Sequence, residues 1–306
     1  MAEEVNGIIN VYKEAGFTSH DVVAKLRGIL HQKKIGHTGT LDPAATGVLP
    51  VCCGKATKVC ELLTDKEKSY RAVCKLGVIT DTQDTTGTVL QTKDISGVTQ
   101  DELSDTIQSF VGDIMQIPPM YSAIKVGGRK LYELAREGKE IERKPRPDTI
   151  YAIDIKDIDL ENGSFTMDVT CSKGTYIRTL CHDIGEKLGC HGCMDKLLRT
   201  RVERFCVEDS LTLSQIETIR DEERLEEIII PIDRMFDEEP AVHLNEELSK
   251  AAHNGNALPL GVSESKPAAG QKIRVYDADG AFVGLYQYEK ERDRQHFRLL
   301  KMFYEK

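Results

Sequence analysis

Apolar positions in the first part of the chain change between strand-like and helix-like spacing. Residues 7–12 are mainly apolar and predict a strand. Thr18 or Ser19 then caps a helix whose apolar face carries Val22, Val23, Leu26, Ile29 and Leu30. Residues 36–47 are rich in glycine and predict a shaped loop, after which residues 48–53 return the chain to the core.

Further along, residues 69–76 alternate as a strand does, and residues 84–88 resemble a turn into another strand. A second amphipathic helix is marked by Leu103, Ile107, Phe110 and Val111. Residues 149–158 and 165–171 read as paired strands joined at a turn, and residues 176–188 suit a helix.

The amino-acid composition changes in the last quarter of the chain. Acidic residues gather in 217–239, where helices are expected, and a loop-like stretch follows at 259–270. Three short strands are predicted, at 272–276, 282–286 and 296–300. Mixed strands and helices followed by a small β-rich unit predict an α+β chain with two domains, 1–240 and 241–306.

Composition indicates a packed protein in a reducing compartment. The 306 residues are 40% hydrophobic and 30% charged, with no apolar run long enough for a membrane span and no apolar signal core near the N-terminus. Nine cysteines, an odd number, favour free thiols over a disulfide framework. We therefore expect a cytoplasmic protein without a membrane partner.

The net charge of −9 is unevenly distributed. Residues 24–36 contain no acid, and a second basic segment carries Lys125, Arg129, Lys130, Arg136, Lys139, Arg143, Lys144 and Arg146. Nucleic-acid binding depends on such local basic faces and not on the sum. Ordinary solvated helix faces explain the same charges equally well.

Common cofactor motifs fail on spacing. Gly47 and Gly54-Lys55-Ala56 are too far apart for a phosphate-binding loop, and neither Gly-x-Gly-x-x-Gly nor His-Glu-x-x-His occurs. Cys190 and Cys193 form one CxxC, but a structural zinc site usually needs a second ligand pair. The sequence predicts neither a metal nor a cofactor.

Asp42 is the single acid of the glycine-rich loop 36–47 and stands between Leu41 and Pro43. Apolar flanks suggest a carboxylate at the wall of a pocket. A turn-forming aspartate before proline is the alternative, and it is common.

Five blocks together resemble the TruB family of tRNA pseudouridine synthases. They are GHTGTLDPAATGVLP at 36–50, KSYRA at 68–72, PPMYSAIK at 118–125, LAREG at 134–138 and SKGTYIRTL at 172–180. The resemblance runs from about residue 7 to residue 205 and continues more loosely to the end of the chain.

The resemblance implies roles for individual residues. Asp42 corresponds to the catalytic aspartate at the ribose C1′ side of the target uridine, and Tyr70 to the tyrosine near the flipped base, implicated in proton removal from C5. Arg178 corresponds to the arginine that pairs with the aspartate, with Tyr176 on the same wall. His37 corresponds to the histidine that occupies space vacated by the flipped base.

Other implied features concern RNA binding. Leu197 falls where the family has an apolar pocket residue, and Lys125 and Arg136 lie in a segment, about 120–147, that resembles an RNA-gripping insertion. The implied fold is a mixed, mainly antiparallel sheet with flanking helices, followed by a PUA-like domain. Core positions for the aromatic and aliphatic residues, and a loop position for His37, are the structural alternatives.

The implied activity is isomerisation of the T-loop uridine, position 55, of a tRNA to pseudouridine. The uridine must leave its stack, at a cost on the order of a few kcal/mol. The implied contacts are to the T-arm and the acceptor stem, by a monomer without an obligate protein partner, and with an accessory role in tRNA folding. The alternatives are a guide-RNA-dependent synthase of a ribonucleoprotein and a non-catalytic tRNA-binding protein.

Overall fold

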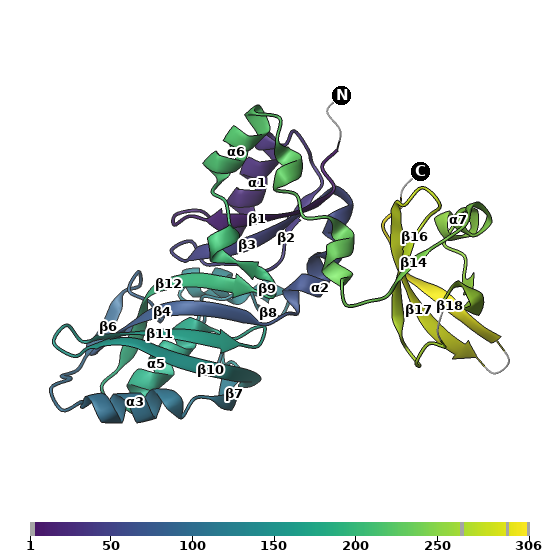
Figure 1. Ribbon diagram of the computed structural model, residues 1–306. Helices are drawn as coiled ribbons and strands as arrows, with labels where there is room; N and C mark the ends of the chain where they lie inside the picture. The colour runs from purple at the N-terminus through teal and green to yellow at the C-terminus, as the bar shows by residue number, and fades with distance from the viewer. Residues whose placement is uncertain (1–3, 264–265, 292–293, 305–306) are drawn as a thin grey trace.

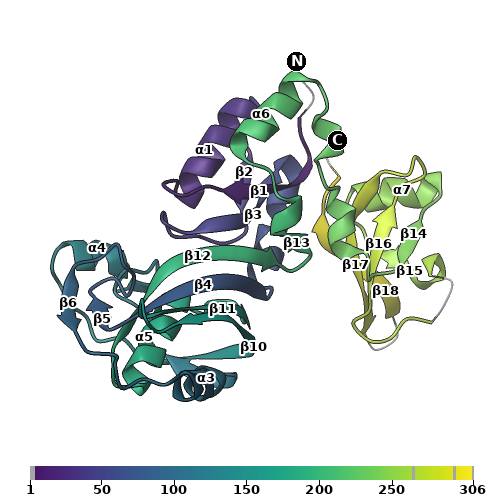
Figure 2. The ribbon, with the colours of Figure 1, turned by 60° about the vertical axis from the view of Figure 1, so that its left-hand side comes forward.

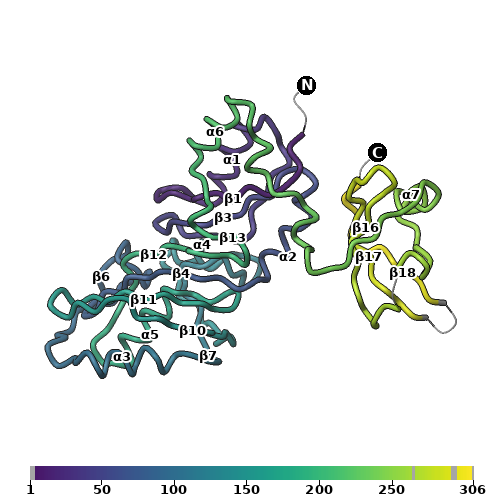
Figure 3. The backbone as a smooth tube through the Cα atoms, viewed as in Figure 1, coloured from purple at the N-terminus to yellow at the C-terminus, as the bar shows by residue number. Residues whose placement is uncertain are grey.

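The computed structural model describes residues 4–263, 266–291 and 294–304. Its strands and helices form a large body and a smaller C-terminal unit, which a connecting segment joins (Figure 1). The path of that segment, residues 222–240, is clearest in the tube view (Figure 3).

The body is organised around one mixed sheet. Its main path runs β1-β3-β12-β4-β11-β10-β7, with β2 and β13 added to β3 and β12. The strands are β1 Gly7–Lys13, β2 Ile35–His37, β3 Thr46–Cys53, β4 Lys68–Leu76, β7 Gly112–Gln116, β10 Arg146–Asp159, β11 Ser164–Cys171, β12 Gly192–Val202 and β13 Phe205–Cys206. Neighbouring strands are antiparallel except β3 and β12, which pair in parallel at Thr46–Leu198 and Gly47–Arg199.

Helices cover the two ends of this sheet separately. Helices α1 (Ser19–Ile29) and α6 (Leu213–Asp221) pack on β1 and β3, whereas α3 (Gln100–Gln108) and α5 (Ile177–Lys187) pack on the other end (Figure 1). Thr18 caps α1 by accepting a hydrogen bond from the Asp21 backbone N–H, at 3.0 Å. The helices at the two ends of the sheet therefore cover separate apolar cores, and a third apolar cluster includes Phe303 of the C-terminal unit.

Two excursions leave the sheet. One is the hairpin of β5 (Val78–Thr80) and β6 (Val89–Thr92). The other holds β8 (Lys125–Val126), β9 (Arg129–Lys130) and α4 (Leu131–Arg136). Its small apolar cluster is formed by the buried Met120, Leu131 and Leu134. Figure 2 shows α4 and the β5–β6 hairpin at the same end of the molecule.

Within its described residues, the C-terminal unit is a five-stranded sheet with one α-helix. Its strand order is β14-β16-β17-β18-β15, and α7 (Glu246–His253) packs on it. The strands are β14 Ala241–His243, β15 Leu258–Pro259, β16 Lys272–Tyr276, β17 Phe282–Glu291 and β18 Arg294–Met302. Tyr276 donates to Asp233 of the connecting segment at 2.8 Å, which fastens the sheet to that segment.

Short helical turns complete the described chain. They are α2 Cys60–Thr64 and the 3-10 turns η1 Gly54–Val59, η2 Val207–Asp209, η3 Leu225–Glu227, η4 Ile232–Phe236 and η5 Leu260–Val262. In the ranges that the structure describes, no helix has both the length and the apolar content needed to cross a bilayer.

The predicted α+β class with a small β-rich end is confirmed, but several local predictions differ from the structure. The loop predicted at 36–47 is shorter, because Ile35–His37 forms β2 against β3. Helix α3 ends at Gln108, and the acidic segment holds one helix followed by 3-10 turns. β12 and β7 were not predicted, because charged residues interrupt the alternation in β12 and β7 is a short edge strand.

Candidate active site

A buried lysine supports the loop that carries Asp42 through hydrogen bonds to its backbone. Lys13, the last residue of β1, is fully buried and donates from Nζ to the carbonyls of Ala45 at 2.6 Å and Pro43 at 3.2 Å. The hydroxyl of Ser19, in α1, accepts from the Leu41 N–H at 2.9 Å. The backbone on both sides of Asp42 is therefore tied to the first strand and helix.

Arg178 forms an ion pair with Asp42. Its Nε lies 3.0 Å from Asp42 Oδ2, and the pair joins the loop to the first turn of α5. The arginine side chain is 6% exposed, whereas the aspartate side chain is 42% exposed. The carboxylate is therefore open to a ligand while its partner is fixed inside the protein.

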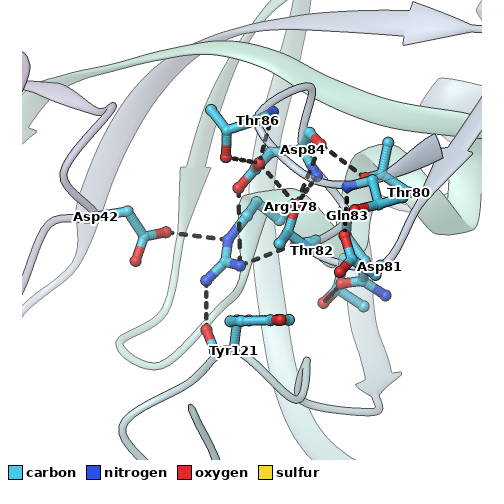
Figure 4. A network of polar contacts seen from close by, with 11 residues as sticks. Asp42, Thr80, Asp81, Thr82, Gln83, Asp84, Thr86, Tyr121 and Arg178 are labelled. Carbon is cyan, nitrogen blue, oxygen red and sulfur yellow. Dashed lines mark hydrogen bonds and ion pairs between the residues drawn. The ribbon is translucent and has the colours of Figure 1, made fainter. Parts of the chain in front are cut away.

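The remaining donors of Arg178 link two further segments to this pair (Figure 4). Nη1 donates to the Thr82 carbonyl at 2.9 Å and Nη2 to the Tyr121 carbonyl at 2.8 Å. Asp84 Oδ2 lies 3.9 Å from Nη1, and its other oxygen accepts from Thr86. One guanidinium thus connects the Asp42 loop, the β5–β6 hairpin and the insertion.

Tyr70 lies in β4 with its ring buried, only 8% exposed. Burial raises the pKa of its phenol to about 12, and the charge of Arg199 acts in the opposite direction. Tyr70 belongs to the same apolar core as Leu41, so the phenol and the Asp42 loop share one wall of packed side chains.

Arg199 is a buried cation that sequence reasoning missed. It is 1% exposed in β12, directly opposite Tyr70 of β4, and its Nε donates to the Val48 carbonyl at 2.7 Å. Nη1 and Nη2 lie 3.5 and 3.4 Å from the carbonyls of Thr40 and Gly39. The only local signal was an arginine that follows two leucines, which is too common to indicate a site.

Tyr176 and Leu197 were both predicted at the pocket. Tyr176 precedes α5, half-buried, and the amide of the buried Gln116 clamps its backbone, accepting from its N–H at 3.0 Å and donating to its carbonyl at 3.2 Å. Leu197 is partly buried in β12, opposite Ala72, and packs on the core that holds Tyr70. Both residues thus adjoin the segments that carry Arg178 and Tyr70.

His37 ends β2, opposite Val51 of β3, and is half-buried. Burial lowers the pKa of its imidazole, with the neighbouring His20 contributing in the same direction. The two rings meet edge to face at 5.3 Å between centroids. The buried Nδ1 has no hydrogen-bond partner among the described residues.

Lys125 and Arg136 are exposed in the insertion. The Arg136 guanidinium lies 5.3 Å from the centre of the Tyr132 ring, and Lys130 approaches the same ring at 5.4 Å. Within the described ranges, no hydrogen bond or ion pair joins Lys125 or Arg136 to Asp42, so the structure does not unite them with the Asp42 site. They lie on the segment whose Tyr121 carbonyl accepts from Arg178.

The cysteines are free thiols. In the described ranges, no group of three or more histidine, cysteine or acidic side chains has the arrangement of a metal site.

Three protein-family models together match most of the chain. Residues 27–177 match the model for the TruB family pseudouridylate synthase N-terminal domain, and residues 178–237 match the model for the tRNA pseudouridylate synthase B C-terminal domain. Residues 240–291 match a third model, the C-terminal part of pseudouridine synthase II TruB.

Individual relatives match over almost the whole chain. Proteins named tRNA pseudouridine synthase B from Lachnoclostridium phytofermentans and Clostridium perfringens strain 13 are 52% and 46% identical, and each alignment covers 98% of this chain and 100% of the relative. A solved Cbf5-Nop10-Gar1 complex contains a chain that is 27% identical with a TM-score of 0.72, covering 97% of this chain and 85% of that one.

The fold and these matches define a pseudouridine synthase. With relatives at this identity over nearly its full length, the chain belongs to the TruB family of pseudouridylate synthases.

Proposed function

We propose that this protein converts the T-loop uridine of tRNA, position 55, to pseudouridine. The ion pair between Asp42 and Arg178 is the observation that carries the proposal, because it presents a half-exposed carboxylate on a buried, fixed cation. Relatives named tRNA pseudouridine synthase B support tRNA as the substrate. An accessory role in tRNA folding accompanies this activity.

The reaction breaks the N1–C1′ bond, turns the uracil and joins C5 to C1′, after which C5 loses its proton. Asp42 is the residue that reacts with the ribose of the target uridine. Its carboxylate either attacks C1′ or removes the C2′ proton, and both routes need an oxygen that the Arg178 contact leaves accessible. Arg178 orients the carboxylate through one nitrogen while its other nitrogens are held by backbone carbonyls.

The other proposed site residues act on the uracil base or contact it. Tyr70 lies beneath the flipped uracil and participates in proton removal from C5, and Leu197 and Tyr176 provide apolar walls. His37 fills the space that the uracil leaves in the T-loop. Its lowered pKa favours a neutral imidazole, which suits a position among stacked bases.

Tight binding of tRNA offsets the cost of extruding the uridine. Lys125 and Arg136 of the insertion, about 120–147, contact phosphates of the T-arm. Residues 1–240 form the catalytic domain. Residues 241–306 form a PUA-like domain that contacts the acceptor stem. The protein acts as a monomer in the cytoplasm and without an obligate protein partner.

The decisive experiment compares wild type with Asp42→Asn on tRNA transcripts carrying tritium at C5 of uridine. Wild type should release tritium at position 55, and the variant should release none while its Kd for tRNA stays within about tenfold. Asp157→Asn, the same change at an exposed residue of β10, is the control and should retain full activity. Tritium release by Asp42→Asn would refute the catalytic assignment.

Guide-RNA-dependent modification is the second candidate, because the solved structures with TM-scores of 0.72 and 0.71 are a Cbf5-Nop10-Gar1 complex and an H/ACA ribonucleoprotein bound to substrate RNA. Purified protein with a bare T-arm hairpin separates the two. Modification of the hairpin supports the stand-alone enzyme, and a requirement for a guide RNA contradicts it. Tight binding without modification by the wild type would indicate a tRNA-binding protein.

A further inference from the structure

Arg199 stands at the junction of the three central strands. It is the residue at which β12 pairs in parallel with Gly47 of β3 and in antiparallel with Tyr70 of β4. Gly47 has a φ of +107°, and a Cβ there would lie 2.2 Å from the Arg199 carbonyl oxygen. The backbone of Arg199 is therefore packed directly against the strand that leaves the Asp42 loop.

The guanidinium of Arg199 is buried without an acidic partner. No carboxylate among the described residues forms an ion pair with it, and its backbone acceptors are the carbonyls of Gly39, Thr40 and Val48. Tyr70 faces Arg199 across the β4–β12 pair, so the two side chains lie next to each other on one face of the sheet. A buried charge is costly unless its donors are used, so this arginine fixes the groups that surround it.

The groups around Arg199 include one part of the site proposed to act on the sugar and one proposed to act on the base. Gly39 and Thr40 lie in the loop that carries Asp42, the residue proposed to act on the sugar, and Tyr70 in β4 is the residue proposed to act on the base. Arg178 reaches Asp42 from the other side, and its hydrogen bonds within the described chain go to Thr82 and Tyr121 instead of Tyr70. Arg199 is thus the cation that is hydrogen-bonded to the Asp42 loop and lies opposite Tyr70.

We propose that Arg199 is a positioning residue that holds the Tyr70 hydroxyl and the Asp42 loop in one geometry, so that the base and the sugar of a single nucleotide are engaged at the same time. This inference rests on the proposed function, because it assigns the base side to Tyr70. Arg199 itself touches neither sugar nor base and acts through these two neighbours.

A double-mutant cycle on single-turnover pseudouridine formation tests this coupling. Arg199→Met has a similar volume without the charge or the donors, and it should slow the wild-type reaction by about 30- to 100-fold with the Kd for tRNA changed by less than about threefold. In a Tyr70→Phe background the same substitution should cost at least about fivefold less than in the wild type, because only the Asp42 loop is then left for Arg199 to position. Arg199→Lys should recover part of the rate.

Controls separate this coupling from a loss of folding. Arg201→Met lies two residues along β12, where the arginine pairs with Glu67 at 2.6 Å near the surface, and should leave the rate unchanged. If Arg199→Met fails to fold, Arg199→Lys takes its place in the cycle. Equal rate losses in the wild-type and Tyr70→Phe backgrounds would overturn the proposal. Absence of pseudouridine from the wild-type reaction would instead contradict the proposed function.

Discussion

Replacement of Arg178 by lysine keeps the positive charge near Asp42 but removes the three-way connection. Arginine reaches Asp42 Oδ2 at 3.0 Å, the Thr82 carbonyl at 2.9 Å and the Tyr121 carbonyl at 2.8 Å from three different nitrogens. A lysine ammonium is a single point on a flexible stem and can serve only part of this set. Arg178→Lys therefore tests whether charge alone is sufficient.

The expected magnitude follows from the lost contacts. A hydrogen bond from a charged donor contributes about 1.5–3 kcal/mol, so losing two buried ones gives an upper limit of about 3–6 kcal/mol. The lysine will recover part of one of these two hydrogen bonds. The ion pair with Asp42 contributes less than about 1 kcal/mol, because the aspartate side chain is partly exposed. We expect the free energy of unfolding to fall by about 3 kcal/mol. Displacement of Asp42 by about 1 Å costs on the order of 100-fold in rate.

Two measurements check this prediction. Urea unfolding is followed by circular dichroism, because the chain has no tryptophan, and single-turnover rates come from tritium release. Arg71→Lys is the matched control, since Arg71 forms a two-point pair with Asp168 on the exposed face of β4. If Arg178→Lys stays within about threefold of the wild-type rate and within about 1 kcal/mol of the Arg71→Lys stability, the three-way argument is wrong.

Three further outcomes follow from the geometry. Gly47→Ala should destabilise the fold by about 3 kcal/mol or more, since its Cβ meets the Arg199 backbone at a φ of +107°, whereas Gly28→Ala, in open space on α1, should stabilise it by about 0.5–1 kcal/mol in the same urea titration. Burial lowers the pKa of Lys13 to about 8 from its ordinary 10.5, so the native lysine loses its proton before the unfolded chain does. Wild-type stability relative to Lys13→Met should consequently rise between about pH 8 and 10.5, and a flat difference would contradict this. Arg136→Ala should reduce the slope of log K for tRNA binding against log salt by about 1, and an unchanged slope would remove Arg136 from the phosphate contacts.

The local pattern of apolar residues was sufficient to predict the elements in which that pattern keeps a constant strand or helix period. The alternation in 165–171 and the helical spacing after Thr18 both led to elements close to those observed, β11 and α1. The class of the fold followed from their order along the chain. Resemblance over several separated blocks then placed Asp42 and Arg178 in one site, and the structure has them 3.0 Å apart.

Only the tertiary structure decided how that site is supported. Lys13 lies under the Asp42 loop from about 30 residues away, and Arg199 reaches Gly39 and Thr40 across 160 and 159 positions. Neither residue carries a local signal, because a lysine at the end of a strand and an arginine after leucines are ordinary surface patterns. Lys13 is placed by the pairing of β1 with β3 and Arg199 by the parallel contact of β12 with β3, and both form only when distant strands are assembled into one sheet.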